Sequence, residues 1–270
     1  MTSYNKTQYD EIADGYDVLD RLPWRETEAH SFRTAIGPML SPDMNVVEFA
    51  CGSGFYSQKI LEWGCKSITG SDISPAMVDG AKQRLSEAVA EGKARFVVGD
   101  ATKPRSLAPD GTEGYFDIAL GVWLLNYAES KEQLTKMFET AALNLKDNGV
   151  FCTVALHPTD NLEERVAAHE KSPLTKVMPR HTYLEKLASG EGWLFKVTLP
   201  GDTTFMTFHL TKEIYEEAAH LGGFKGKLEW RPEIWKDEDL KKRYASWMTG
   251  ADWDVRREHP HMSVLVVHKN

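Results

Sequence analysis

Residues 45–54 read Asn-Val-Val-Glu-Phe-Ala-Cys-Gly-Ser-Gly, and this run is the strongest indication of the fold of the chain. Its first half is a short apolar run with one glutamate, and an amphipathic stretch that ends at Gly64 follows its two glycines. This order predicts a strand over residues 45–50, then a tight turn and a helix. Gly52 and Gly54 allow the backbone to turn sharply there and to approach a ligand closely.

The alternation of strand and helix continues to residue 156. Ser74-Pro75 supplies an N-cap followed by a proline at the first helical position, and Ser130 with Gln133 forms a capping box for a later helix. Such alternation predicts a mostly parallel sheet that helices cover on both faces. The expected strands are 45–50, 67–72, 95–99, 116–121 and 150–156, and the expected helices are 55–64, 74–91 and 130–149, the last ended by Gly149.

The pattern changes after His157. Residues 158–192 are polar and irregular and predict one short helix. The segment Leu-Pro-Gly-Asp at residues 199–202 separates two stretches of strand character and predicts a hairpin. The remaining expected elements are the hairpin strands 193–199 and 203–209, a helix over 211–221, closing strands over 226–230 and 262–268, and a helix over 237–248 between those two.

Composition and charge narrow the class of protein. The 270 residues have a formal net charge of −8 and no run of lysine or arginine, which argues against nucleic acid or an anionic membrane as a partner. We expect no spanning helix and no signal peptide, since no long apolar stretch occurs and the first residues are polar. Cys51, Cys65 and Cys152 form no CxxC pair, which favours a reducing, cytoplasmic location.

Three acidic residues stand in or at the ends of successive predicted strands. Glu48 lies in the first strand, Asp72 ends the second, and Asp100 follows the third. In an open parallel sheet, ligands bind outside the carboxyl ends of the strands. A carboxylate at Asp72 can accept charge-assisted hydrogen bonds from both hydroxyls of a ribose, and Asp100 can accept one from an adenine amino group. The set therefore predicts a site for an adenosine-containing cofactor.

The segments VVEFACGSG, ITGSDIS, RFVVGDAT and FDIALGVWLLNYA resemble the ordered motifs of class I S-adenosylmethionine-dependent methyltransferases. The run LLNYA also resembles enzymes of the toxoflavin synthase type. The resemblance implies a Rossmann-like, doubly wound α/β fold, with a seven-stranded, mostly parallel sheet and an antiparallel last strand. It also implies one domain over residues 1–270, with residues 1–40 as an N-terminal cap and residues 158–210 as a lid insertion over the substrate.

The resemblance also implies S-adenosylmethionine as the cofactor and assigns residues to it. The glycine turn would lie beside the methionine part, and backbone groups after the fourth strand would meet the methionine end. The acids after the second and third strands would bind ribose and adenine. The implied residues are Gly52, Gly54, Gly121 and Val122 at the methionine end, Asp72, Ile73, Met77 and Asp100 on the adenosine part, and Tyr16, Glu48, Ala50 and Ala101 beside them.

Methyl transfer to a small molecule is the activity that the resemblance implies. The sulfonium already activates the methyl group, so the protein mainly has to align donor and acceptor in a dry pocket. A neutral acceptor also needs a base, for which His157 is the first candidate and His209 the second. The aromatic residues of the two covering segments favour an apolar or heteroaromatic acceptor. The candidate pocket aromatics are Tyr9, Tyr16, Trp24, Trp123 and Tyr127.

Other classes of protein stay open. A cyclase or a binding protein would keep the cofactor without transferring its methyl group. A nicotinamide-dependent oxidoreductase is disfavoured, because its G-x-G-x-x-G pattern needs a glycine where this chain has Ser57. His259-Pro260-His261 is interpreted as a surface loop rather than a metal pair, since no cluster of cysteine or acidic residues accompanies it. We expect no metal, and a monomer or homodimer.

Overall fold

The computed structural model describes residues 23–171, 180–198, 204–235, 242, 254 and 257–270. At its centre lies a seven-stranded sheet in the order β3-β2-β1-β4-β5-β10-β9. The first five strands are parallel, and β10 runs antiparallel to both of its neighbours. This confirms the Rossmann-like fold expected from the sequence. The strands are β1 (Asn45–Phe49), β2 (Ser67–Asp72), β3 (Ala94–Val98), β4 (Phe116–Leu120), β5 (Leu145–Leu156), β9 (Leu228–Pro232) and β10 (Met262–His268).

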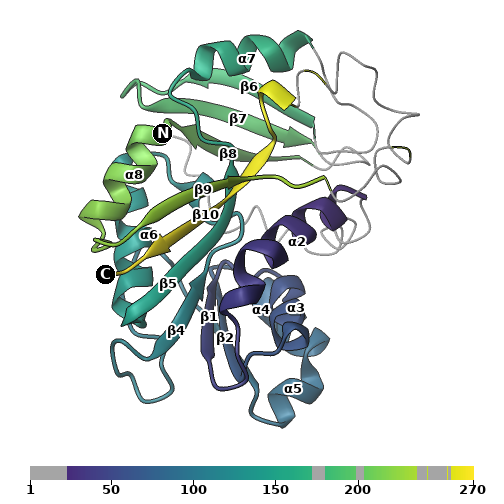
Figure 1. Ribbon diagram of the computed structural model, residues 1–270, viewed down its shortest axis with the longest axis vertical. Helices are drawn as coiled ribbons and strands as arrows, with labels where there is room; N and C mark the ends of the chain where they lie inside the picture. Colours follow the sequence, from purple (N-terminus) through teal and green to yellow (C-terminus); the bar gives the residue numbers. More distant parts are fainter. Residues whose placement is uncertain (1–22, 172–179, 199–203, 236–241, 243–253, 255–256) are drawn as a thin grey trace.

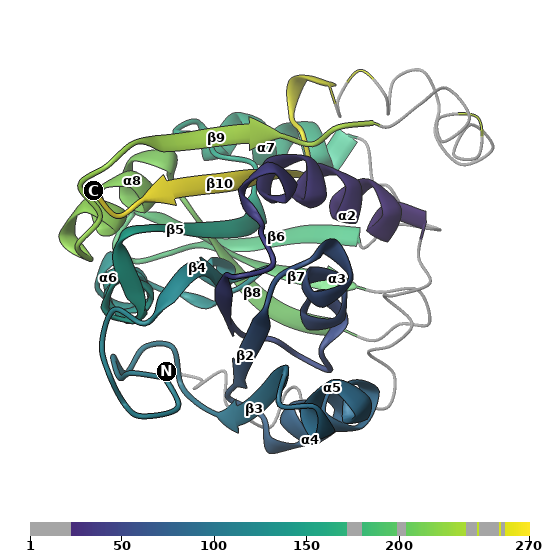
Figure 2. The same cartoon turned by 60° about the horizontal axis from the view of Figure 1, so that its bottom comes forward.

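Helices cover both faces of this sheet (Figures 1 and 2). Because side chains alternate along a strand, Val46 and Val47 enter different apolar cores, one on each face. The core around Val46 is closed by α2 (Pro23–Ile36), α3 (Phe55–Trp63), α4 (Pro75–Arg84) and α5 (Ser86–Ala90), and the core around Val47 by α6 (Lys131–Asn144) and α8 (Lys212–Leu221).

The segment after β5 adds a helix and a second, antiparallel sheet of order β6-β7-β8. The hairpin of β7 and β8 confirms the sequence expectation, whereas β6 was not predicted, because its sequence RHTYLEK is mostly polar. Leu156, at the end of β5, packs with Phe195, Val197 and Phe205 of the second sheet. The small sheet therefore meets the carboxyl edge of the large one. The added elements are α7 (Leu162–Lys171), β6 (Arg180–Lys186), β7 (Gly192–Thr198) and β8 (Thr204–Leu210).

Two helix boundaries differ from the prediction. The helix expected to end at Gly149 ends at Asn144, because the Asn144 side chain bonds outward: its Nδ2 donates to Arg105 O at 2.8 Å and its Oδ1 accepts from Leu107 N at 2.7 Å. The helix expected over residues 74–91 is interrupted at buried Leu85, whose angles are φ −109° and ψ 32°. The helix expected over 237–248 lies outside the described residues, apart from Lys242.

Candidate active site

The turn after β1 is held by backbone hydrogen bonds and glycine geometry. Cys51 N donates to Ser71 O, and Gly54 N donates to Cys51 O, each at 3.0 Å. Gly52 and Gly54 have φ angles of 53° and 85°. A Cβ on Gly54 would lie 2.9 Å from the Leu85 side chain, so α4 packs directly against this glycine. The turn is thus fixed from both sides, as the sequence motif indicates.

Two non-glycine residues in the described part of the chain have a positive φ: Ala50 at 54° and Trp123 at 59°. They follow β1 and β4, the adjacent strands between which the strand order reverses. Such a conformation costs about 1–3 kcal/mol and is concentrated at functional sites. The reversal of strand order is also where ligands bind in open α/β sheets. Strain and topology therefore indicate the same edge of the sheet.

Asp72 at the end of β2 holds the glycine turn in place. Its Oδ2 accepts from Gly52 N and its Oδ1 from Ser74 N, both at 2.9 Å. The carboxylate is buried. Asp72 thus couples the turn after β1 to the start of α4, a role that its position in the sequence did not reveal.

Replacing Asp72 by asparagine is expected to weaken S-adenosylmethionine binding by about 1.5–3 kcal/mol, the range for hydrogen bonds to a charged group. One carboxylate oxygen becomes an amide NH₂ that faces backbone donors. Calorimetric titration measures the affinity, with Asp79→Asn on the exposed side of α4 as the control. Unchanged affinity in a folded Asp72 variant would contradict this role.

Glu48 is buried in β1 and accepts a hydrogen bond from Ser57 of α3. Burial raises the pKa of this carboxyl to about 8; the hydrogen bond from Ser57 opposes the rise, and the nearby charge of Asp72 adds to it. Glu48 is therefore protonated and uncharged at neutral pH, so it does not present a negative charge to a ligand.

The raised pKa makes folding stability depend on pH. The unfolded chain releases the Glu48 proton above about pH 4.5, whereas the folded chain keeps it up to about pH 8. The free energy of unfolding should therefore fall as pH rises from 5 to 8, by up to about 1.4 kcal/mol per pH unit. Chemical denaturation of Glu48→Gln should lack this component, and Glu62→Gln on exposed α3 surface should retain it. If the free energy of unfolding changed with pH in the same way in the wild type and in Glu48→Gln, burial would not raise the pKa of Glu48.

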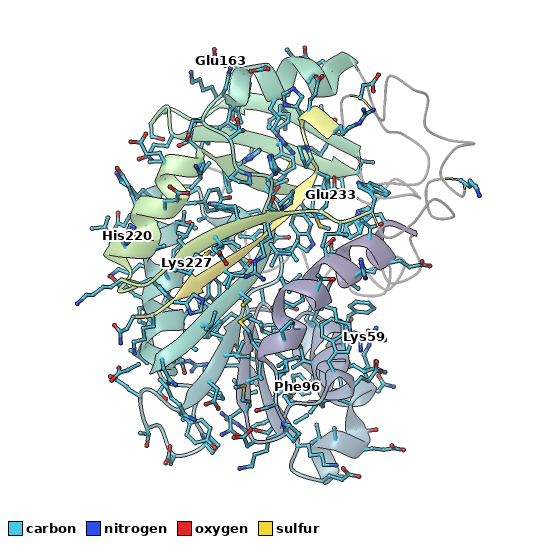
Figure 3. All side chains as sticks on the ribbon, viewed as in Figure 1. Lys59, Phe96, Glu163, His220, Lys227 and Glu233 are labelled. Atoms are coloured by element: carbon cyan, nitrogen blue, oxygen red, sulfur yellow. The ribbon has the colours of Figure 1, made fainter. Side chains whose placement is uncertain are left out.

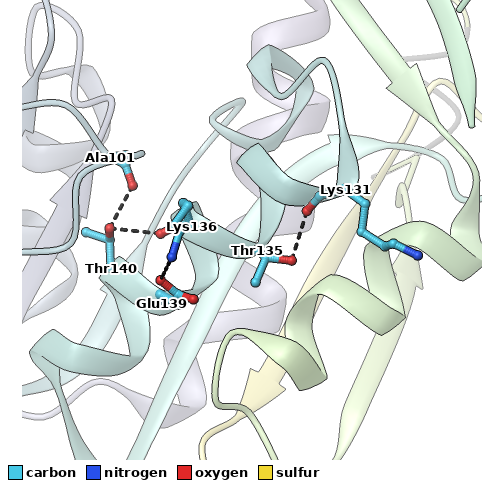
Figure 4. Close-up of polar contacts among 6 residues, drawn as sticks. All are labelled: Ala101, Lys131, Thr135, Lys136, Glu139 and Thr140. Atoms are coloured by element: carbon cyan, nitrogen blue, oxygen red, sulfur yellow. Dashed lines mark hydrogen bonds and ion pairs between the residues drawn. The ribbon is translucent and has the colours of Figure 1, made fainter. Parts of the chain in front are cut away.

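Asp100 lies after β3 at a small, half-open hollow, whose lining includes Phe49 and Ser71 from the ends of β1 and β2. Partial burial raises the pKa of Asp100, but hydrogen bonds from Thr102 and Lys103 outweigh it and lower the pKa below 3.8. Asp100 is therefore a charged acceptor. The neighbouring Ala101 carbonyl accepts from Thr140 of α6 at 2.7 Å, which fixes the wall of the hollow (Figure 4).

The other residues implied for the cofactor lie along the same edge. Ile73 is half-buried and Met77 is buried. Both backbone groups of Gly121 are engaged within the chain, since its N donates to Cys152 O at 3.1 Å and its O accepts from Leu124 N at 2.9 Å. Among the backbone groups expected to meet the methionine end, those of Val122 are thus the better candidates. Tyr16 lies outside the described residues.

Three aromatic rings meet beside β4. The ring centroids of Trp24 and Trp123 are 6.1 Å apart, and that of His261 lies 5.9 Å from the first and 5.7 Å from the second. His261 is buried, and its backbone N donates at 3.0 Å to Glu233, the residue labelled near the end of β9 in Figure 3. The interpretation of His261 as part of a surface loop was therefore wrong. The described residues contain no cluster of metal-ligating side chains around it.

The two candidate bases occupy different surroundings. His157 Nδ1 lies 2.8 Å from Ser263 Oγ, and burial, followed by the charges of Arg165 and His259, lowers its pKa to about 4. His209 is fully buried inside the small sheet, with its Nδ1 2.8 Å from the Tyr183 hydroxyl. His157 is therefore neutral at pH 7, and its Nε2 is the atom that can accept a proton when Nδ1–H donates to Ser263.

The remaining candidate aromatics do not gather at one place. Tyr127 packs against the core beneath α6 and α8, whereas Trp123 packs with the small sheet. Tyr9 lies outside the described residues. Sequence reasoning also missed Glu28 and Arg25 of α2, which are buried next to Trp123. Their only sequence signal is a spacing of three residues, which is usual for exposed helix pairs.

Comparison with known proteins agrees with this geometry. Residues 46–149 match the family described as methyltransferase domain, while no curated protein sequence matches the chain. Among solved structures, the chain complexed with the Haloferax volcanii Trm112 methyltransferase activator has a TM-score of 0.60 and 18% identity, covering 98% of this chain and 96% of that one.

Two further structures share the fold. A geranyl diphosphate methyltransferase with GPP and sinefungin has a TM-score of 0.56 and 14% identity, over 91% of this chain and 78% of that one. An S-adenosylmethionine-dependent methyltransferase from Methanosarcina mazei has a TM-score of 0.55 and 15% identity, over 87% and 96%. Residues 46–149 are thus similar to a methyltransferase domain, and the chain as a whole shares the fold of S-adenosylmethionine-dependent methyltransferases.

Proposed function

We propose that this chain transfers the methyl group of S-adenosylmethionine to a small, apolar or heteroaromatic metabolite. The observation that carries the proposal is the apolar cluster of Leu156, Phe195, Val197 and Phe205, against which Trp123 packs. This cluster lies where the small sheet meets the carboxyl edge of the large sheet, and the strained residue Trp123 contacts it. A dry, apolar chamber at this edge would exclude water from the transfer, which needs alignment more than proton chemistry.

The cofactor placement belongs to the same proposal. The methionine part of S-adenosylmethionine would lie on the turn after β1 and against Val122, and the adenosine part would extend over the ends of β2 and β3. The Asp100 hollow borders the ends of β1 and β2, the edge on which this placement puts the adenine ring. The residues proposed to contact S-adenosylmethionine are Tyr16, Glu48, Ala50, Gly52, Gly54, Asp72, Ile73, Met77, Asp100, Ala101, Gly121 and Val122.

The acceptor side rests on fewer observations. We propose Trp24 and Trp123 as acceptor contacts, together with Tyr9 and Tyr127, and His157 as the base, with His209 as the alternative. The geranyl diphosphate methyltransferase shares only the fold with this chain, but its name adds prenyl diphosphates to the acceptors worth testing.

The decisive experiment is a screen of purified protein with S-adenosylmethionine and pools of small metabolites, including heteroaromatic compounds and prenyl diphosphates. We expect S-adenosylhomocysteine to form only when an acceptor is added, with a product heavier by one methylene unit. The Gly52→Val variant serves as the inactive control. Conversion of an added substrate without S-adenosylhomocysteine formation would favour the cyclase alternative, and tight cofactor binding with no conversion would favour a binding protein.

We also propose that residues 1–40 and 158–210 close over the acceptor as a lid. Hydrogen exchange should slow in both segments when S-adenosylhomocysteine and the acceptor are bound together, because closure removes their amides from water. Mass-spectrometric exchange with S-adenosylhomocysteine alone provides the control. Protection confined to residues 45–122 under both conditions would contradict the lid.

No helix in the described part of the chain has the length and apolar character needed to cross a bilayer. We propose that the chain acts as a monomer or homodimer. One structural neighbour forms a complex with a methyltransferase activator, so an accessory subunit is the alternative. Sedimentation velocity of the active protein distinguishes the states, since activity of an isolated monomer or dimer rules out an obligatory activator.

A further inference from the structure

A buried carboxylate links three elements around the candidate site. Glu28 of α2 has a relative exposure of 0%. Its Oε2 accepts from Trp123 Nε1 at 2.6 Å, while its Oε1 accepts from the Tyr56 hydroxyl at 2.6 Å and from Arg25 at 2.5 Å. The Arg25 guanidinium in turn lies 4.6 Å from the centroid of the Phe55 ring. The carboxylate thus connects α2, the first turn of α3 and the loop after β4.

Stability alone does not account for this arrangement. Removing a carboxylate and a guanidinium from water costs several kcal/mol per ion, and apolar residues of similar volume often serve a core as well or better. The buried ion pair lies beside Trp123, which has a φ of 59°. A strained residue keeps such a conformation only when its surroundings determine it from several directions. The conformation of Trp123 is held by the hydrogen bond to Glu28 and by contacts with the rings of Trp24 and His261.

The place of Trp123 suggests what this constraint does. Trp123 follows Gly121 and Val122 directly, and its ring is only half-buried although its N–H is bonded to Glu28. The face of an indole attracts a cation through its quadrupole, and tryptophan is the best of the aromatic residues for this contact. S-adenosylmethionine carries a positive sulfonium, whereas S-adenosylhomocysteine, the product, carries a neutral thioether.

We propose that Glu28 is a positioning residue that holds the indole of Trp123 toward the sulfonium, so that the site favours the charged methyl donor over the uncharged product. The inference rests on the proposed placement of the methionine end at Val122. It assigns Glu28 a function through Trp123 rather than through contact with the cofactor. Its consequence is that loss of the methyl group itself weakens the hold on the product and helps it to leave.

The test needs no acceptor. Calorimetry would measure the Kd of S-adenosylmethionine and of S-adenosylhomocysteine for the wild type and for Glu28→Gln, Trp123→Phe and Tyr56→Phe. The quantity compared is the ratio of the product Kd to the donor Kd. Trp123→Phe keeps a ring but removes the N–H that Glu28 holds. Tyr56→Phe removes a donor from the same carboxylate but leaves the bond to Trp123, so it is the matched control.

We expect Glu28→Gln and Trp123→Phe each to lower the ratio by about 2- to 30-fold, the span of cation–π contacts. The double variant Glu28→Gln, Trp123→Phe should lower the ratio no more than the more effective single change, because both changes break the same hydrogen bond. Tyr56→Phe should lower the melting temperature and keep the ratio. Trp123→Phe also keeps the test open if Glu28→Gln fails to fold.

Equal weakening of both ligands in Glu28→Gln would overturn the inference, since it would indicate a merely structural role. A further fall of the ratio in the double variant, or the same fall in Tyr56→Phe, would also overturn it. Either result would leave methyl transfer intact as the proposed function. Failure of the wild type to bind S-adenosylmethionine at all would instead overturn the proposed function, and this inference with it.

Discussion

Replacing Gly52 by valine is expected to abolish S-adenosylmethionine binding. The φ of this residue is 53°, a conformation that a β-branched side chain adopts only under strain. Strain alone is not decisive, because Ala50 tolerates a φ of 54° two residues earlier. The larger expected effect is that the isopropyl group would fill the space that the proposed placement gives to the methionine part of the cofactor. Calorimetric titration with S-adenosylhomocysteine and with S-adenosylmethionine measures the loss.

Gly92→Val is the matched control for this prediction. Gly92 has a φ of 70°, and a Cβ there would meet nothing within 4 Å. The substitution therefore imposes the same kind of backbone strain at a site far from any proposed ligand contact. We expect it to lower the melting temperature and to keep the affinity. Full cofactor affinity in a folded Gly52→Val protein would show that the turn after β1 is not the floor of the site.

Replacing His157 by alanine is expected to slow methyl transfer by 10²- to 10⁴-fold, if the acceptor loses a proton in the reaction, while leaving cofactor affinity nearly unchanged. The pKa of about 4 favours the lower end of this range, because a weaker base gives less assistance. Rates are measured with the acceptor that the metabolite screen provides. His259→Ala is the control: it removes a histidine whose charge contributes to the lowered pKa of His157, and it should have a small effect.

The same pKa fixes the expected pH dependence. His157 is a base only when it is neutral, and lowering its pKa keeps it neutral down to about pH 4. The rate of methyl transfer should therefore stay level from pH 8 to pH 5 and fall only as the pH approaches 4. A fall in the rate centred near pH 6.5, the ordinary pKa of histidine, would show that the His157 ring is exposed or that a different group is the base. An unchanged rate in His157→Ala would remove this residue from the chemistry.

The sequence alone was enough to predict the parallel core and the placement of Asp72 and Asp100 at one edge of it, because both depend on local patterns. The run at residues 45–54 contains a strand, a turn and a helix start within ten positions, so its structure follows from neighbours along the chain. Parallel strands align their carboxyl ends, and for that reason Asp72 and Asp100 could be assigned to one edge without knowledge of the packing. The family resemblance of the same segments then indicated the cofactor.

The tertiary structure decided what depends on distant residues. Glu28 and Trp123 are 95 residues apart, and nothing in the helix sequence distinguishes this buried carboxylate from an exposed one. The pKa values of Glu48 and His157 come from burial, which is a property of the packed chain. The early end of α6 likewise follows from hydrogen bonds between Asn144 and the segment at Arg105 and Leu107. Local sequence determines the secondary structure and the position of each side chain along it. Desolvation and contacts with distant residues determine the charge and the orientation of those side chains.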